Sequence, residues 1–183
     1  MTKASRPAPV HHLALRVREV SQLFNSMDPT PFLNKDLDKD AEEFIESWAT
    51  EFPRDSRFQI TIYLEQWPSN GDPTETLTGA VQNYFLYKEQ RTRRSLKQLL
   101  HLGRVSLVIG LLFVSLCLLL ADGIRRFGNN AGYEVARESL TIIGWVAMWR
   151  PLQTFLYDWW PLQRQIYLYQ RLHKARIQVI HGK

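Results

Sequence analysis

The chain has 183 residues, a formal net charge of +5 and one cysteine. This length suits one ordinary domain, or a small domain with a membrane anchor, and the mean hydropathy of −0.27 excludes a bundle of many membrane spans. The single cysteine, Cys117, excludes an intramolecular disulfide and any cysteine-based metal site.

Charge divides the chain into two halves. Residues 1–87 hold 8 Lys and Arg against 13 Asp and Glu, whereas residues 88–183 hold 15 against 5. The positive charges of the second half flank apolar runs, which is the pattern expected beside anionic lipid headgroups rather than nucleic acid. Residues 1–10 predict a flexible tail without the apolar core of a signal peptide, so we expect the N-terminus to stay in the cytoplasm.

The first half predicts a β-α-β arrangement. Residues 12–20, HLALRVREV, and residues 57–67, RFQITIYLEQW, alternate apolar and polar side chains with the period of a half-buried strand. Between them, residues 40–52 have the pattern of an amphipathic helix, in which Asp40 caps the first turn and Glu43 completes a capping box.

The predicted cytoplasmic domain, residues 11–72, has too few strands. Two strands joined through a helix are most simply parallel, but a two-stranded sheet is marginal on its own. We therefore expect the sheet to be completed by another copy of the chain, by a partner chain, or by a short strand within residues 20–35.

A long helix is predicted to follow the domain. Asp72 and Pro73 are a cap and a first helical position, and the helix predicted for residues 73–102 ends in a strongly basic segment. Residues 88–104 hold six Lys and Arg and one acid. We interpret residues 73–102 as a basic linker helix that leads toward a membrane.

The first membrane span is predicted over residues 103–122. Its core, VSLVIGLLFVSLCLLLA, has seventeen residues without charge, and snorkelling of Arg104 extends it to the about 30 Å of a hydrocarbon core. A buried core helix is the alternative, but so small a chain has little material to cover this run on all sides.

A second span is predicted over residues 139–160. The apolar run of residues 139–149 is too short alone, but continued to Trp160 it forms about 33 Å of helix. An arginine near the centre, Arg150, costs about 2.5 to 3.5 kcal/mol on insertion scales. The alternative is that residues 152–160 lie along the membrane interface.

Charge counting predicts the topology of this hairpin. The link over residues 123–138 is nearly balanced, whereas residues 88–104 and 161–183 are basic, so the positive-inside rule places both termini in the cytoplasm of a plasma or bacterial inner membrane. Residues 161–183 predict a basic amphipathic C-terminal helix at or just below the membrane surface.

Four polar residues of the hairpin are candidate functional residues. Arg150 could neutralise an anion or a partner's carboxylate, or it could snorkel and cap carbonyls freed by Pro151. In an antiparallel hairpin Asp158 falls near the depth of Arg104, which suggests a salt bridge. Asp122 is the fourth, at the end of the first span.

Three small residues are candidates for close helix packing. Ser106 and Gly110 are four residues apart on the first span, and Gly144 is on the second. Small residues of this kind allow two helix backbones to approach in a membrane.

Other features predict neither catalysis nor a cofactor. The acids of residues 36–43 lack the glycine and glutamate positions of an EF-hand, and the histidines are not paired across two spans. Phosphate loops, nucleophile elbows and zinc-protease motifs do not occur. We therefore expect no metal, no cofactor and no enzymatic activity.

The run LFNSMDPTPFLNKDLDKDAEEFI is similar to a segment of small bacterial membrane proteins of unknown function. The resemblance covers mainly residues 13–52 and implies no activity and no site residues.

Together these patterns predict an α+β protein. We expect a cytoplasmic β-α-β domain, a long helix, a two-span transmembrane hairpin and a C-terminal amphipathic helix. The predicted role is a membrane-anchored interaction module, meaning an adaptor, accessory subunit or assembly factor, whose partners are anionic lipids and either another copy or a membrane protein. The alternative is a homo-oligomeric pore or transporter with a path lined by Arg150 and Asp122, and a third possibility is an enzyme that acts on lipids.

Overall fold

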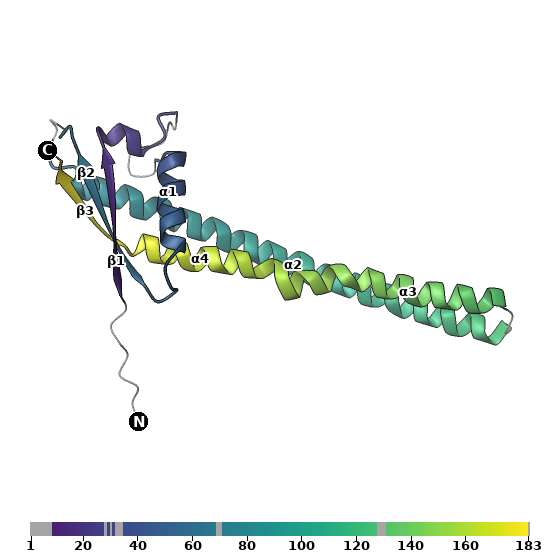
Figure 1. The fold of residues 1–183 in the computed structure, drawn as a ribbon. Helices are drawn as coiled ribbons and strands as arrows, with labels where there is room; N and C mark the ends of the chain where they lie inside the picture. The colour runs from purple at the N-terminus through teal and green to yellow at the C-terminus, as the bar shows by residue number, and fades with distance from the viewer. Residues whose placement is uncertain are drawn as a thin grey trace, which may run out of the picture. The chain divides into compact units, whose positions relative to one another are not determined.

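The fold is a mixed α+β architecture (Figure 1). The computed structural model describes residues 9–27, 29, 31, 35–68, 71–127 and 131–182. It divides into two compact units, Met1–Thr92 with Arg164–Lys183, called the domain below, and Arg93–Gln163, called the hairpin. The elements are β1 (Val10–Val17), η1 (Val20–Leu23), α1 (Lys39–Thr50), β2 (Arg57–Leu64), α2 (Thr74–Phe127), α3 (Ala131–Gln153), η3 (Thr154–Asp158), α4 (Trp159–His173) and β3 (Arg176–His181).

The two predicted strands are confirmed, and they pair in parallel. Val10 of β1 lies opposite Arg57 of β2, and the register continues to Val17 and Leu64. The alternation of the sequence places one side of each strand in the interior. The buried residues are Leu13, Leu15, Phe58, Ile60, Ile62 and Leu64.

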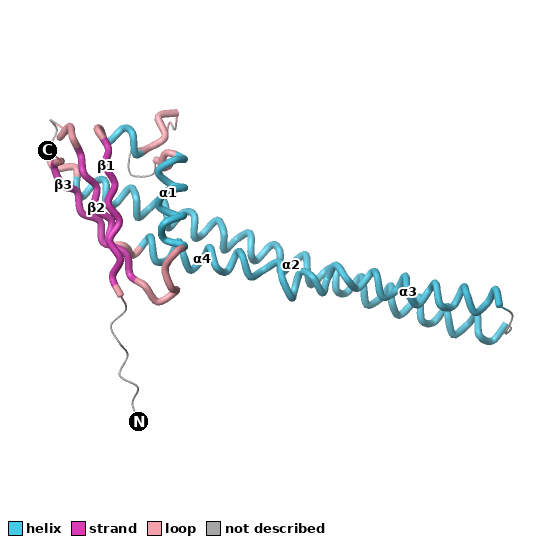
Figure 2. The backbone as a smooth tube through the Cα atoms, in the orientation of Figure 1, coloured by secondary structure: helices cyan, strands magenta, loops and turns pink. Residues whose placement is uncertain are grey.

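The third strand comes from a part of the chain where we predicted a helix. β3 pairs in parallel with β2, from Gln59 opposite Arg176 to Leu64 opposite His181, so the strand order is β1-β2-β3 (Figure 2). The helix predicted for residues 161–183 therefore ends at His173. The described part of residues 20–35 holds the short 3-10 helix η1 instead of a strand. The sheet thus gains its third strand within one chain.

Helix α1 begins earlier than predicted, and its cap differs. Asp38, not Asp40, is the N-cap, and its carboxylate accepts a hydrogen bond from the backbone N–H of Asp40 at 3.0 Å. The bond satisfies one of the free donors of the first turn, where Asp40 and Glu42 supply negative charge. Helix α2 begins one residue later than predicted, at Thr74, and its first helical hydrogen bond runs to the carbonyl of Pro73. Asp72, one residue before this cap position, accepts from the N–H of Thr74 at 2.9 Å.

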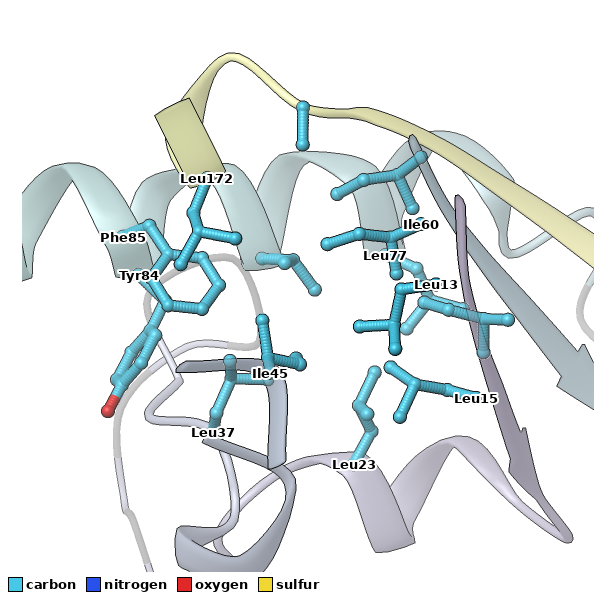
Figure 3. Packing of buried hydrophobic residues seen from close by; sticks show 14 of the residues in the cluster. Leu13, Leu15, Leu23, Leu37, Ile45, Ile60, Leu77, Tyr84, Phe85 and Leu172 are labelled. Atoms are coloured by element: carbon cyan, nitrogen blue, oxygen red, sulfur yellow. The ribbon is translucent and has the colours of Figure 1, made fainter. Parts of the chain in front are cut away.

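One face of the sheet is covered by α1, the first turns of α2 and the end of α4. Leu13, Ile60 and Leu77 point into the same interior (Figure 3). The beginning of α2 is therefore part of the domain rather than of a linker. The apolar face of α4 also packs in this core, whereas we expected it at a membrane surface. The core residues from these two helices are Leu77, Ala80, Val81, Tyr84, Phe85, Ile166, Leu168, Tyr169 and Leu172.

The hairpin consists of the second part of α2, α3, η3 and the start of α4. α3 runs antiparallel to α2: a Cβ on Gly110 would meet Met148, and a Cβ on Gly144 would meet Cys117 (Figure 1). The predicted link over residues 123–138 is mostly helical, because α2 continues to Phe127 and α3 begins at Ala131.

Candidate functional site

The centre of the hairpin is a contact between Gly110 and the segment around Pro151. Pro151 has no N–H, so the carbonyl of Ala147 loses its usual helical donor. An added Cβ on Gly110 would lie 3.0 Å from Met148 Sδ, 3.6 Å from Pro151 Cγ and 3.7 Å from that carbonyl oxygen. The glycine thus allows α2 to approach α3 where the helix is interrupted.

A π-helical turn, η3, follows the proline. Thr154 is 5 % exposed, and its hydroxyl lies 3.2 Å from the carbonyl of Arg150 and 3.3 Å from the Asp158 carboxylate. Its single proton serves one acceptor at a time. The indole N–H of Trp159 donates to the Phe155 carbonyl at 2.8 Å. Side chains thus add hydrogen bonds to backbone carbonyls in and just before the irregular turn.

Gly103 is a packing residue that we did not select from the sequence. An added Cβ there would lie 2.9 Å from Thr154 Cγ2 and 3.4 Å from Phe155. Gly103 and Gly110 are seven residues apart, which is two helical turns, so they share a face of α2. Ser106 between them donates to the carbonyl of Leu102 at 2.9 Å and contacts that of Gly103 at 3.1 Å.

Arg104 and Asp158 do not form the expected salt bridge. The exposed Arg104 donates through Nε to the carbonyl of Leu100 at 3.3 Å, whereas Asp158 accepts from Thr154. The predicted depth is nearly right, because Gly103 faces Thr154 one turn before Asp158. The direction of the side chain is different. Each residue turns the side chain by about 100° around the helix axis, so Arg104, one residue after Gly103, does not point toward α3 as Gly103 does.

Arg150 and Asp122 are not brought together. Arg150 is exposed and lies at the level of Gly110, because Met148 and Pro151 contact that glycine. Asp122 is twelve residues further along α2, about 18 Å away along the axis, and pairs with Arg126 at 3.2 Å. In a pore built from several hairpins, Arg150 and Asp122 would therefore lie at two different levels along the path and would not form one ring.

Most of the hairpin's apolar surface is exposed. The described helix from Thr74 to Ile124 is long and apolar enough to cross a membrane, and 17 % of its most apolar window is buried. Within the part of the chain that the structure describes, this is the one helix long and apolar enough to cross a membrane. The exposed large side chains of the hairpin include Leu112 at 68 %, Leu119 at 71 %, Trp145 at 70 % and Trp149 at 72 %.

A second polar cluster lies in the domain, between α1, α2 and α4. Lys88 forms an ion pair with Glu42 and lies 3.9 Å from Glu46. The phenol of Tyr84 donates to Glu42 at 2.5 Å. The ring of Tyr169 lies 5.7 Å from the Lys88 ammonium. Since these side chains come from three separate helices, sequence patterns did not associate them.

The two carboxyls of this cluster differ in pKa. Burial, together with the neighbouring Glu42, raises the pKa of Glu46 to about 7. Burial also acts to raise the pKa of Glu42, but hydrogen bonds with Lys88 and Tyr84 outweigh it, so that pKa is lowered. One carboxylate is thus held charged beside Lys88, and the other takes up a proton near neutral pH.

Among the described residues, no group of three or more histidine, cysteine, aspartate or glutamate side chains could hold a metal ion. Cys117 is buried against Gly144. No family model, curated protein or solved structure matches the chain. Its function therefore has to be inferred from its own residues.

Proposed function

We propose that this chain is a membrane-anchored interaction module without enzymatic activity. Its hairpin crosses a bilayer twice, and its α+β domain lies on the cytoplasmic side, where it acts as an adaptor, accessory subunit or assembly factor of a membrane complex. The proposal is supported most strongly by the domain, because its core combines segments from before and after the hairpin.

Those segments are joined by specific contacts. Phe85 of α2 stacks on Tyr169 of α4 with ring centroids 6.3 Å apart. Gln82 of α2 donates to the carbonyl of Ala175 at 3.2 Å. Since both segments fold into one core, they lie on the same side of any membrane. A chain that crosses at residues 105–121 therefore has to cross again before Arg164.

The surface of the hairpin supports the bilayer as its environment. A helix in the core of a soluble domain would be mostly buried, but the most apolar part of α2 is mostly exposed. The exposed leucines and tryptophans of α2 and α3 would be solvated by lipid. The basic segment of residues 88–104 favours the cytoplasmic side for the domain.

Cysteine labelling tests the two crossings. In a Cys117→Ala background, single cysteines replace Arg18, Gly132 or Lys174, and intact and inverted membrane vesicles are treated with a membrane-impermeant thiol reagent. We expect Arg18→Cys and Lys174→Cys to react from one side and Gly132→Cys from the other. An added Cβ at Gly132 meets nothing within 4 Å, so this substitution is tolerated. Reaction of all three from the same side would contradict the proposal.

Native mass spectrometry tests the interaction role. The tagged chain is extracted from its own host in a mild detergent, with an unrelated two-span protein as the control for carry-over. We expect a second polypeptide at fixed stoichiometry. A homo-oligomer without a second polypeptide would favour the pore, which ion flux in proteoliposomes, abolished by Arg150→Leu, would then establish.

A further inference from the structure

A pocket of about 670 Å³ lies at the amino ends of the three strands. Val10, Arg57 and Arg176 begin the strands that form its floor, the loop before β2 contributes Arg54 and Ser56, and the last turns of α4 form a wall. This volume is within the range of small-molecule sites. The pocket belongs entirely to the domain.

The lining of this pocket is strongly cationic. The described residues of the lining include no acidic side chain and five basic ones, which are Arg54, Arg57, Arg171, Lys174 and Arg176. Arg57 lies two residues before Gln59, whose partner on β3 is Arg176, so the two arginines are diagonal neighbours on one face of the sheet. Like charges on neighbouring strands repel one another, and an anion bound between them would relieve this repulsion.

Several of these charges have no ion-pair partner among the described residues of the domain. Among the described residues, Arg54, Arg57, Lys174 and Arg176 form no ion pair within 4 Å. Asp55 is the nearby acid, and it interacts with Arg171. Two of the five have other contacts. Arg171 donates to the carbonyl of Pro53 and lies 4.8 Å over the ring of Phe58, and Arg54 lies 6.0 Å over the ring of Tyr167.

Two buried polar groups of the lining are also without partners. Ser56 is 2 % exposed, and its hydroxyl makes no hydrogen bond to any described residue. Nε of Arg171 is likewise buried without an acceptor. An unmade hydrogen bond at a buried group costs about 1 to 3 kcal/mol, so such groups are normally satisfied.

We infer that this pocket binds a small phosphate-bearing anion. A phosphate group accepts several hydrogen bonds at once and pairs with arginine in a bidentate geometry, which suits a lining with four arginines and a lysine. A single carboxylate would leave most of these donors unused. The inference is independent of the membrane crossing, since it uses residues of the domain alone.

Titration of the purified full chain in a non-ionic detergent with pyrophosphate tests the inference. We expect saturable binding that is weakened about tenfold or more by the double substitution Arg57→Gln and Arg176→Gln, because each lost charge-assisted bond is worth about a factor of ten. Both side chains are exposed, so the fold should tolerate their replacement. Lys174→Gln is a second variant at an exposed turn, and Ser56→Ala tests the hydroxyl.

The matched control is the combined replacement Arg16→Gln and Arg18→Gln, which also removes two positive charges, at and just beyond the opposite end of β1. Its affinity for pyrophosphate should equal that of the unaltered chain. Equal weakening by the control and the double variant would overturn the inference, because binding would then follow net charge alone.

A second arm identifies the source of the phosphate. Thermal unfolding is measured with short-chain phosphatidic acid and with phosphatidylcholine of the same chain length. Stabilisation by phosphatidic acid alone, lost in the double variant, assigns the pocket to a lipid headgroup, whereas binding of pyrophosphate without this effect assigns it to a free phosphate compound. Failure of the unaltered chain to bind either probe would overturn the inference.

Discussion

The domain and the hairpin use similar apolar residues in opposite ways. Leu172 in the domain is fully buried, whereas Leu119 in the hairpin is 71 % exposed. The domain buries its apolar side chains against one another, so its own residues determine its fold. The hairpin leaves most of its apolar surface to its surroundings, and within it only small residues and the segment around Pro151 specify how α2 meets α3.

The largest expected difference between the two regions comes from replacing one leucine with alanine in each. Leu172→Ala leaves a cavity in a closed core and should cost about 2 to 5 kcal/mol. Leu119→Ala, at an exposed position, should change the stability of the domain by no more than about 0.5 kcal/mol. Hydrogen–deuterium exchange of β2 amides measures both. Equal exchange in the two variants would mean that the regions are not packed differently.

A charged residue should impair membrane insertion when it is placed in the hairpin but not when it is placed in the domain. Leu112→Arg places a charge within the apolar run and should cost about 3 kcal/mol if that run inserts in a bilayer. Tyr87→Arg, 52 % exposed on the domain part of the same helix, is the matched control and should have no effect on insertion. The fraction of protein that resists alkaline extraction from membranes measures the difference. Alkaline extraction of the unaltered chain would contradict a membrane location, and full resistance of the Leu112 variant would show that a charge at this position does not impair insertion.

Two glycines of α2 should respond oppositely to alanine. In Gly103→Ala the new methyl group would lie 2.9 Å from the stiff side chain of Thr154, and this overpacking costs about 1 to 3 kcal/mol. In Gly123→Ala the methyl group meets nothing within 4 Å, so the helix gains up to about 1 kcal/mol. Thermal unfolding in detergent, followed by far-UV circular dichroism, measures both. A stabilised Gly103 variant would show that the contact with Thr154 is not tight.

The smallest effect concerns the acid cluster of the domain. The pKa of Glu46 is about 7 in the folded chain against an ordinary 4.5, so the folded state binds more protons between these values and its stability falls as the pH rises through this window. Glu46→Gln should remove this decline. Relative to the unaltered chain, the variant should gain about 1 kcal/mol above pH 7, after allowance for solvent screening, and nothing below pH 4.5.

Chemical unfolding at several pH values tests this expectation, with Glu43→Gln as the control that removes a charge from an exposed position of α1. The lowered pKa of Glu42 acts in the opposite direction and at lower pH, where protonation of this carboxylate removes its stabilising contact with Lys88. A Glu46 variant with an unchanged pH profile would show that this carboxyl titrates normally.

Local signals explain what the sequence predicted well. The alternation in β1 and β2 and the start of α2 just after Asp72 depend on residues within a few positions of one another. The strand β3 was missed because its six residues follow a helical pattern directly and pair with a distant part of the chain. The hydrogen bond between Gln59 and Gln178 joins residues 119 positions apart. The alternation of Ile177 and Val179 with polar neighbours was the available signal.

The candidate site required information that spacing does not contain. The lengths of the two helices predicted that Arg104 and Asp158 lie at similar positions along the hairpin. Which faces of the helices meet depends instead on packing at Gly103 and Gly110. The basic pocket was invisible for a similar reason. Its charges come from residues 54–57 and 171–176, two short stretches that are brought together only when β3 joins the sheet.

The position of β3 has a consequence for the order of events during synthesis. A ribosome makes β1, α1 and β2 first, then the whole hairpin, and only afterwards the strand that pairs along the free edge of β2. Until then the nascent domain has two strands and an open edge on which another chain could pair. The sheet can therefore be completed only after both helices of the hairpin have been synthesised. A folded domain thus implies that the whole hairpin is already present.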